Sequence, residues 1–170
     1  MSKPKKLLGK YRGTVVSNFD PEGRGRIQVT LVDAGAQIPL STYATPCLPF
    51  SGINAGMFSI PVPGAGVWIE FENGELDHPI WVGGYWGSLA EVPKLALLTP
   101  QPLGSATIAT ATGAGIHISD NPALGVMITN GQGAVILINS AGITITNGKG
   151  ATIVMAGRTI DFNQLALTIT

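Results

Sequence analysis

Apolar and polar residues alternate along short stretches of the first half of the chain. Val67, Ile69 and Phe71 take every second position of the stretch 66–72, and Arg26–Val32 alternates in the same way. A period of two is typical of a β-strand with one buried face. Two further stretches have the composition of short strands: Lys10–Asn18 and Ile80–Val82.

Turn-forming residues separate these strand candidates. Asp20–Gly25 has the composition of a turn, Asn73-Gly74 is a strong signal for a tight turn, and Gly83-Gly84 ends the last strand. No stretch between residues 9 and 88 has the period of an amphipathic helix. About five short strands in this length fit a small closed barrel, so we predict an all-β chain with an OB-fold over residues 9–88.

The last third of the chain repeats itself. The 13 residues Gly125–Leu137 align with Gly142–Val154, 17 residues later, and eight of the 13 pairs are identical. A short period of this kind marks the stacked strand units of a β-solenoid or β-prism. The positions that define the repeat are Ile128, Asn130, Gly131, Ile136, Ile143, Ile145, Asn147, Gly148 and Ile153.

Such a repeat cannot bury its apolar face within one unit, so its isoleucines need another surface. Either the chain coils on itself as a solenoid, or three chains wrap together with Ile, Val and Leu directed to a shared axis. Residues 106–170 would make only roughly three to four turns of a solenoid, which is a short body. We favour a homotrimeric triple-stranded β-helix (β-prism), because three chains build a longer and stiffer needle from the same residues.

The remaining segments extend and connect these two domains. Lys3, Lys5 and Lys6 make residues 1–8 a basic N-terminal tail. Residues 89–105 are rich in residues that break regular structure, which indicates a linker. The predicted organisation is tail 1–8, collar domain 9–88, linker 89–105 and needle 106–170.

Charge is balanced overall and uneven along the chain. Ten basic and ten acidic residues cancel, so nothing draws the chain generally to nucleic acid or acidic lipid. Only four charged residues follow residue 101: Asp120, Lys149, Arg158 and Asp161. The last third must therefore stay in solution through Thr, Asn, Ser and Gly, or bury its surface against other chains.

The sequence offers neither a membrane span nor a disulfide framework. The long uncharged run from 121 to 148 is interrupted by Pro122 and by Gly, Asn and Gln, whereas a spanning helix needs about 20 largely apolar residues. Leu7-Leu8 is too short for the apolar core of a signal peptide, so we expect synthesis in the bacterial cytoplasm. Cys47 has no partner cysteine and is expected to be a structural small hydrophobe.

A long ordered pattern in the first half is specific to one family. Phe58–Trp86 contains Pro and Gly before a strand, then Phe-Glu, Gly-Glu, Asp-His-Pro, a second strand and Gly; Gly13–Val16 and Asp20–Val29 add to it. Residues 9–88 thereby resemble the OB domain of the central spike of contractile phage tails and related injection systems, namely baseplate assembly protein V and the VgrG proteins. The positions that carry the resemblance are Asp20, Pro21, Gly23, Arg26, Pro63, Gly64, Gly66, Phe71, Gly74, Asp77, Pro79 and Gly83.

The resemblance implies a homotrimer whose three OB domains form a collar under a tail hub. In this family the C-terminal segments intertwine into a needle that pierces the envelope of the target cell when the sheath contracts. The resemblance thus implies a non-enzymatic part of a phage virion or injection-particle baseplate, without a cofactor.

Departures from the family pattern refine this expectation. Residues 89–105 leave no room for the lysozyme domain of some members, and no hub domain precedes the OB domain, so the hub should be a separate protein. No histidine follows His117, so the iron-binding tip of some needles should be absent. The strand-like end of the chain would then need a separate cap of the PAAR type, because a blunt sheet end exposes unpaired backbone groups.

Other function classes find less support in the sequence. A nucleic-acid-binding OB-fold would use basic residues and aromatic platforms, but the acidic residues near Asn73-Gly74 would repel phosphate. Threonines on one face of the repeat would suit an ice-binding or adhesive solenoid, for which an OB-like domain has no purpose. The Gly-rich pieces lack the following helix of a phosphate loop, and no clustered acids suggest catalysis.

Two histidines are the remaining candidates for chemistry. His117 lies between Ile116 and Ile118, so it points outward if the isoleucines point to the axis. In the opposite register three copies of His117 would meet near the axis and could bind a metal or an anion. His78 is expected to be a hairpin residue.

Overall fold

The protein is described by a computed structural model that covers residues 6–33, 36–164 and 166–169. The regular elements of these residues are β-strands and short 3-10 helices, so the prediction of an all-β chain is confirmed. The chain divides into two compact units, Met1–Leu89 and Ala90–Thr170, and each unit has its own sheet. Within the described ranges no helix has the length and apolar character needed to cross a membrane.

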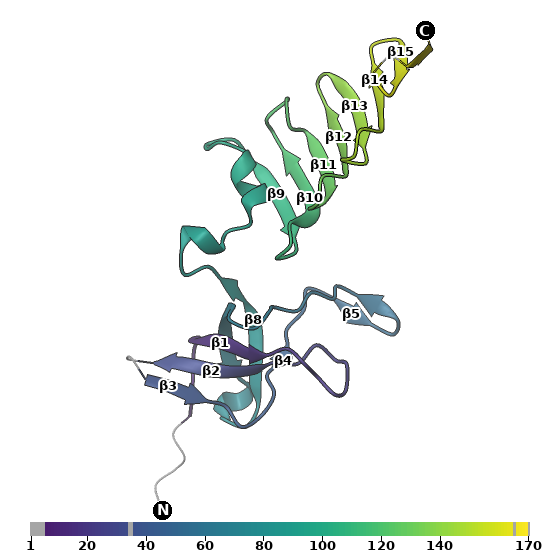
Figure 1. The fold of residues 1–170 in the computed structure, drawn as a ribbon. Helices are drawn as coiled ribbons and strands as arrows, with labels where there is room; N and C mark the ends of the chain where they lie inside the picture. The colour runs from purple at the N-terminus through teal and green to yellow at the C-terminus, as the bar shows by residue number, and fades with distance from the viewer. Residues whose placement is uncertain (1–5, 34–35, 165, 170) are drawn as a thin grey trace, which may run out of the picture. The chain divides into compact units, whose positions relative to one another are not determined.

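Unit 1 contains a six-stranded sheet in the order β3-β2-β1-β7-β8-β4 (Figure 1). All neighbours are antiparallel except β4 and β8, which are parallel. An antiparallel bridge between Ile27 and Ala44, with N–H···O distances of 3.1 and 2.8 Å, brings the β4 side of the sheet back to β2, as a small barrel requires. The strands are β1 (Tyr11–Ser17), β2 (Gln28–Asp33), β3 (Ala36–Pro39), β4 (Thr45–Pro46), β7 (Gly66–Phe71) and β8 (Pro79–Tyr85).

The core of unit 1 uses the alternating positions of these strands. Val67, Ile69 and Phe71 of β7 are buried, as the period of two predicts. Fully burying such a side chain contributes roughly 1.5–3 kcal/mol. Trp68 lies on the other face of β7, where its ring centroid is 5.1 Å from that of Tyr85. The buried apolar cluster of the described residues is Val15, Ile27, Val29, Leu31, Ala44, Val67, Ile69, Phe71 and Trp81.

The connection between β7 and β8 is longer than the tight turn that Asn73-Gly74 suggests. A short 3-10 helix, η1 (Glu72–Gly74), follows β7, and the N–H of Glu72 donates to the carbonyl of His78 at 2.9 Å, which closes the loop 72–78. Both Asn73 and Gly74 have positive φ, so they do reverse the chain. The loop is wider because pairing resumes only at Pro79.

Residues 6 and 7 of the predicted tail are tied to this loop. The N–H of Leu7 donates to the carbonyl of Gly74 at 3.0 Å. Lys6 Nζ donates to the carbonyl of Asn73 at 2.8 Å and forms an ion pair with Glu75 at 2.7 Å. The described end of the tail therefore packs on unit 1.

Unit 2 is an eight-stranded sheet in which the strands follow one another in chain order (Figure 1). Each neighbouring pair is antiparallel, so the chain runs up and down and one 17-residue repeat is a pair of strands. The single chain does not coil, so the solenoid alternative is wrong for these residues. The strands are β9 (Ser105–Ala109), β10 (Ala114–Ser119), β11 (Val126–Asn130), β12 (Val135–Asn139), β13 (Gly142–Thr146), β14 (Thr152–Ala156), β15 (Thr159–Phe162) and β16 (Leu167–Ile169).

The predicted linker is partly structured. It contains two short 3-10 helices, η2 (Leu89–Glu91) and η3 (Lys94–Leu98). The second of them packs on β9 and β10, and Thr99, which follows it, is buried. The end of the linker thus covers one face of the first strands of unit 2.

Candidate functional site

Apolar side chains form two rows across the sheet of unit 2. In one row Ile116, Ile128 and Ile136 lie directly opposite one another on neighbouring strands, and Ile118 and Val126 begin the same pattern two residues away. Residues two apart in a strand share a face, so both rows belong to one surface, which we call the isoleucine face. Its members are Ala106, Ile108, Ile116, Ile118, Val126, Ile128, Ile136, Ile138, Ile143, Ile145, Ile153, Met155, Ile160, Phe162, Leu167 and Ile169.

The isoleucine face is open to solvent in the single chain. Ile108, Ile116 and Ile138 are 69, 43 and 45% exposed. The buried apolar cluster of the described residues lies wholly in unit 1, so the sheet of unit 2 has no comparable core. An apolar surface of this extent indicates a protein–protein contact. The isoleucine face is therefore the principal candidate site of the chain.

The predicted repeat residues divide between this face and the turns. Five of them lie on the isoleucine face: Ile128, Ile136, Ile143, Ile145 and Ile153. Sequence reasoning did not include Ile108 and Ile160, because neither lies within the aligned repeat. The sequence did indicate these two residues through the alternation of apolar and polar positions. Only the strand register, however, shows that they continue the rows of the isoleucine face.

The Asn-Gly positions of the repeat form two equivalent turns. Asn130 Oδ1 accepts the N–H groups of Gln132 and Ala134 at 2.8 and 3.1 Å. Asn147 Oδ1 accepts those of Lys149 and Ala151 at the same two distances. The following residues, Gly131 and Gly148, donate their N–H groups to the hydroxyls of Thr129 and Thr146 at 3.0 and 3.1 Å. The two repeats therefore conserve a hydrogen-bonded turn as well as a pattern of strands.

His117 lies on the face opposite Ile116 and Ile118, as the alternation of side chains along a strand requires, and it is fully buried. Its Nε2 lies 2.9 Å from Thr99 Oγ1, and its Nδ1 lies 2.7 Å from Thr107 Oγ1. Both ring nitrogens are thus engaged within the protomer, and in this arrangement neither is free to bind a metal or an anion. The sequence missed Thr99 because it lies in the predicted linker.

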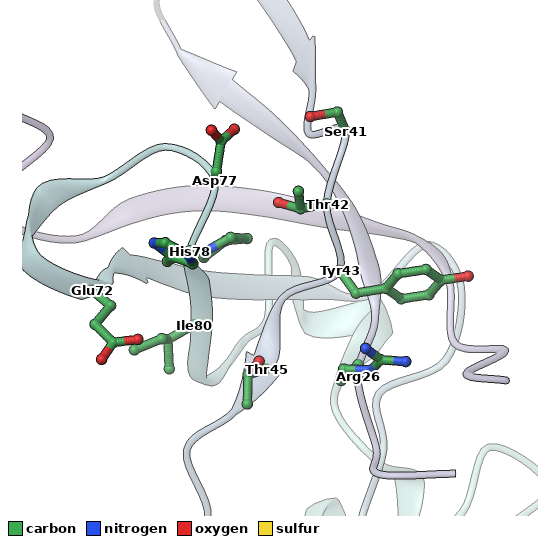
Figure 2. Close-up of a pocket in the computed structure, with 10 residues that line it drawn as sticks. Arg26, Ser41, Thr42, Tyr43, Thr45, Glu72, Asp77, His78 and Ile80 are labelled. Atoms are coloured by element: carbon green, nitrogen blue, oxygen red, sulfur yellow. The ribbon is translucent and has the colours of Figure 1, made fainter. Parts of the chain in front are cut away.

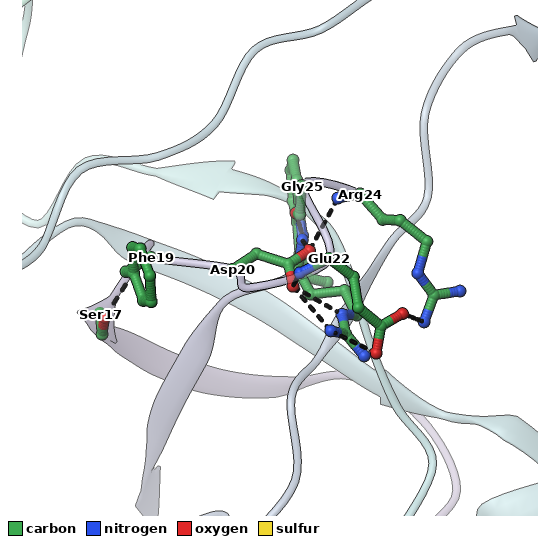
Figure 3. A network of polar contacts seen from close by, with 8 residues as sticks. Ser17, Phe19, Asp20, Glu22, Arg24 and Gly25 are labelled. Atoms are coloured by element: carbon green, nitrogen blue, oxygen red, sulfur yellow. Dashed lines mark hydrogen bonds and ion pairs between the residues drawn. The ribbon is translucent and has the colours of Figure 1, made fainter.

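The motif residue Asp20 organises the turn before β2 (Figure 3). Its carboxylate accepts the backbone N–H groups of Glu22, Arg24 and Arg26 at 3.0, 2.8 and 3.2 Å. Arg26 also donates to Oδ1 through Nε and Nη2 at 3.0 and 2.7 Å. These bonds, the Arg26 side chain first among them, hold the pKa of Asp20 far below its usual range. Pro21 and Gly23 lie within the same turn, so this part of the motif is structural.

Several of the remaining motif positions, namely Gly64, Gly66, Pro79 and Gly83, lie within or beside the sheet. Gly64 donates its N–H to the carbonyl of Val15 at 2.8 Å, which ties the segment after Pro63 to β1. A Cβ on Gly66 would lie 2.8 Å from the ring of Tyr85. Pro79 is fully buried at the start of β8, and Gly83 lies opposite Trp68 next to a break in the register.

A shallow hollow of about 430 Å³ lies beside the β7–β8 loop (Figure 2). Glu72, Asp77 and His78 line it together with Arg26 and Tyr43. The carboxylates of Glu72 and Asp77 point away from each other, so they do not form a general acid–base pair (Figure 2). No group of three or more His, Cys, Asp or Glu side chains that could hold a metal occurs among the described residues.

Three of the aromatic residues that could serve a nucleic-acid-binding OB-fold, Trp68, Trp81 and Tyr85, are engaged within unit 1. The guanidinium of Arg12 lies 5.5 and 5.3 Å from the ring centroids of Trp68 and Tyr85. Trp81 is buried and donates its Nε1–H to the carbonyl of Gly25 at 3.2 Å. These rings are not arranged as a free platform for stacked bases.

Comparison with protein families finds a matching family model for each of the two main sheets. A model of the type VI secretion system/phage-baseplate injector OB domain matches residues 11–86, which include the six-stranded sheet. A model of the phage baseplate V C-terminal trimerisation domain matches residues 105–168, which include nearly all of the eight-stranded sheet and the isoleucine face. A comparison with curated proteins found no match.

The two matches join an injector OB domain to a trimerisation domain in the order that the sequence pattern indicates, and they confirm the resemblance and the expected homotrimer. The chain therefore belongs to the phage baseplate V family of trimeric phage-baseplate and type VI secretion injector proteins.

Proposed function

We propose that three copies of this protein form the central spike of a contractile baseplate, which docks on a separate tail hub and pierces the envelope of the target cell. The observation that carries the proposal is the isoleucine face, a continuous apolar surface on a sheet without a core of its own. A trimerisation domain over the same residues supplies two identical partners to cover it.

In the proposed trimer the three isoleucine faces turn toward a shared axis and the chains intertwine into a β-helical needle. Each isoleucine that loses its remaining exposure contributes a fraction of the roughly 1.5–3 kcal/mol of full burial. The face holds many such side chains, so their combined burial favours association strongly.

The needle acts mechanically in this proposal. Each backbone hydrogen bond of the sheet contributes about 0.5–1.5 kcal/mol net, and many such bonds oppose unfolding together. A body of this kind opens slowly under load, as transmission of an axial force requires. No enzymatic step is needed, and we propose a non-enzymatic role.

The end of the sheet suggests a further partner. β16 (Leu167–Ile169) is the last strand of the order, so one edge of its backbone has no neighbouring strand among the described residues. An apolar edge strand is a site for addition of another chain unless it is covered. A cap of the PAAR type is therefore proposed at this end.

Mass measurement by light scattering, combined with electron microscopy of the purified full chain, tests the spike. Three copies in a narrow rod are expected at micromolar concentration. A compact folded monomer would remove the piercing role, because a single sheet leaves its apolar face unprotected.

A further inference from the structure

Unit 1 carries a projecting apolar hairpin. β5 (Ser51–Gly52) and β6 (Ala55–Gly56) form a separate two-stranded sheet that extends from the barrel (Figure 1). Ile53 at its tip is 96% exposed, and Phe50 and Phe58 near its base are 62 and 69% exposed. We call residues 50–58 the apolar arm.

The composition of the apolar arm points to a contact surface rather than a solvated loop. No charged residue occurs between Asp33 and Glu70, so the arm and its flanks are entirely uncharged. Hairpin tips usually hold Gly, Asn, Asp or Ser, and a two-stranded hairpin alone is marginally stable in water. An exposed isoleucine at such a tip, with exposed phenylalanines near the base, lowers solubility unless another surface covers these side chains.

A matching apolar hollow lies at the base of the same hairpin. Its volume is about 410 Å³, and its lining includes Leu48, Pro49, Met57, Trp81 and Val82. Cys47, which the sequence analysis expects to be a structural small hydrophobe, also lines the hollow and is exposed. The hollow is large enough for an isoleucine side chain.

The tip of the apolar arm does not reach the hollow of its own chain, whose lining includes Met57 but not Ile53. Ile53 lies three residues beyond Phe50 along a strand direction, so the tip stands roughly 10 Å from the base. A tip and a hollow at opposite ends of one short arm make a head-to-tail contact, which forms a ring when the rotation closes. The trimerisation domain holds three copies together, and tethering of this kind gives effective concentrations on the order of millimolar.

We propose that the apolar arm of each protomer inserts Ile53 into the hollow beside Cys47 of the next protomer, so that three arms lock the OB domains into a ring. This contact rests on the trimeric spike proposed above and goes beyond it, because the trimerisation domain lies in unit 2. The occupant is a second copy of this chain, since both surfaces are apolar, uncharged and present once per copy.

Disulfide trapping in the full chain tests the contact. A disulfide forms only when the two Cα atoms lie roughly 4.4–6.8 Å apart, so it reports close approach of residues 47 and 53. Under oxidised glutathione, Ile53→Cys should give dimers and trimers on non-reducing gels, with a 47–53 cross-linked peptide in mass spectrometry. The double variant Ile53→Cys/Cys47→Ser has one thiol per chain and should give dimers at most.

Thiol reactivity supplies a measurement that does not need the engineered cysteine. Cys47 of the wild-type trimer should react slowly with a thiol reagent, Ile53→Asp should speed the reaction several-fold, and Ile53→Leu should leave it slow. Because Ile53 is 96% exposed in the protomer, we expect these variants to fold.

The outcomes separate this contact from the spike itself. A trimer by mass that shows no 47–53 peptide and a freely reactive Cys47 would overturn the ring while leaving the spike intact; the arm would then face the hub. A monomer by mass would remove both.

Discussion

At the scale of single residues, polar groups that look available for chemistry in the sequence are saturated by neighbours in the structure. The Asp20 carboxylate accepts three backbone N–H groups and the Arg26 side chain, and the His117 ring lies between two threonine hydroxyls. A saturated side chain has no free donor or acceptor for a substrate. Both residues therefore contribute to the stability of the fold. The effect of replacing either one should be measured in unfolding experiments.

Acid should weaken unit 1 through Asp20. The pKa of Asp20 is lowered in the folded protein, chiefly by Arg26, from an unfolded value of about 3.9. Its stabilising contribution is therefore complete above pH 4 or so and is lost as the pH falls through the lower folded value. Asp20→Asn should lower the unfolding midpoint at neutral pH, and its difference from wild type should shrink in acid.

Tryptophan fluorescence can follow this effect, because Trp68, Trp81 and Trp86 all lie in unit 1. Glu75→Gln is a matched control: Lys6 lowers the pKa of Glu75, but the pair is about half exposed and should contribute little. A difference between Asp20→Asn and wild type that stays constant into strong acid would argue against the charge as its cause.

Replacement of His117 should destabilise the first hairpin of unit 2. His117→Leu leaves the half-buried Thr107 hydroxyl without this partner, whereas Thr99 Oγ1 keeps Ser119 Oγ, 2.6 Å away. A fully buried unsatisfied polar group costs about 1–3 kcal/mol, so we expect a loss in the lower part of that range. His117→Gln keeps a donor and an acceptor and should recover part of the loss. Hydrogen exchange of β9 and β10 would measure both effects, and equal exchange in all three proteins would contradict the assignment.

At the scale of elements, the turns of the repeat stack on one another and set the spacing of the strands. Gly148 lies against Gly133 of the preceding turn, and a Cβ on Gly148 would come within 2.5 Å of the Gly133 backbone. The equivalent glycine of the first repeat, Gly131, packs in the same way against the backbone of residues 112–114. Close backbone contact explains why both repeats keep glycine there.

Gly148→Ala should therefore cost more than Gly157→Ala. Both glycines have a left-handed conformation, with φ of 70° and 56°, but a Cβ on Gly157 meets nothing within 4 Å. The left-handed conformation alone costs an L-residue roughly 1–2 kcal/mol, so the excess at Gly148 measures the stacking contact. Unfolding rates in guanidinium at equal protein concentration make the comparison, and equal rates for the two variants would mean that the turns are not tightly stacked.

The sequence predicts the elements better than it predicts their connections. The alternation in β2 and β7 and the two repeats locate strands correctly, because side chains on opposite faces of a strand differ in burial. The β5–β6 hairpin escaped prediction because its strands have two residues each and its tip is apolar. The meander of unit 2 also escaped, because a 17-residue period fits either one coil of a solenoid or two antiparallel strands.

At the scale of the whole molecule, burial is divided unequally between the two units. The OB domain encloses its core within one chain, whereas the sheet of unit 2 leaves the isoleucine face exposed in the single chain. Charge follows the same division, because only four charged residues follow residue 101. Folding of unit 2 should therefore depend on protein concentration, as expected for an obligate oligomer.

Two neighbouring residues of β13, Thr144 and Ile145, lie on opposite faces of the sheet, so substitutions at these positions test which face forms the trimer contact. Ile145→Asp places three carboxylates at the proposed axis of the trimer, where removal of each charge from water costs several kcal/mol. Light scattering should then report loss of the trimer. Thr144→Asp adds the same charge one residue earlier, on the opposite face of the sheet, and should keep three copies together. If Thr144→Asp dissociates the trimer and Ile145→Asp does not, the chains associate through the other face and the isoleucine rows are not the axis.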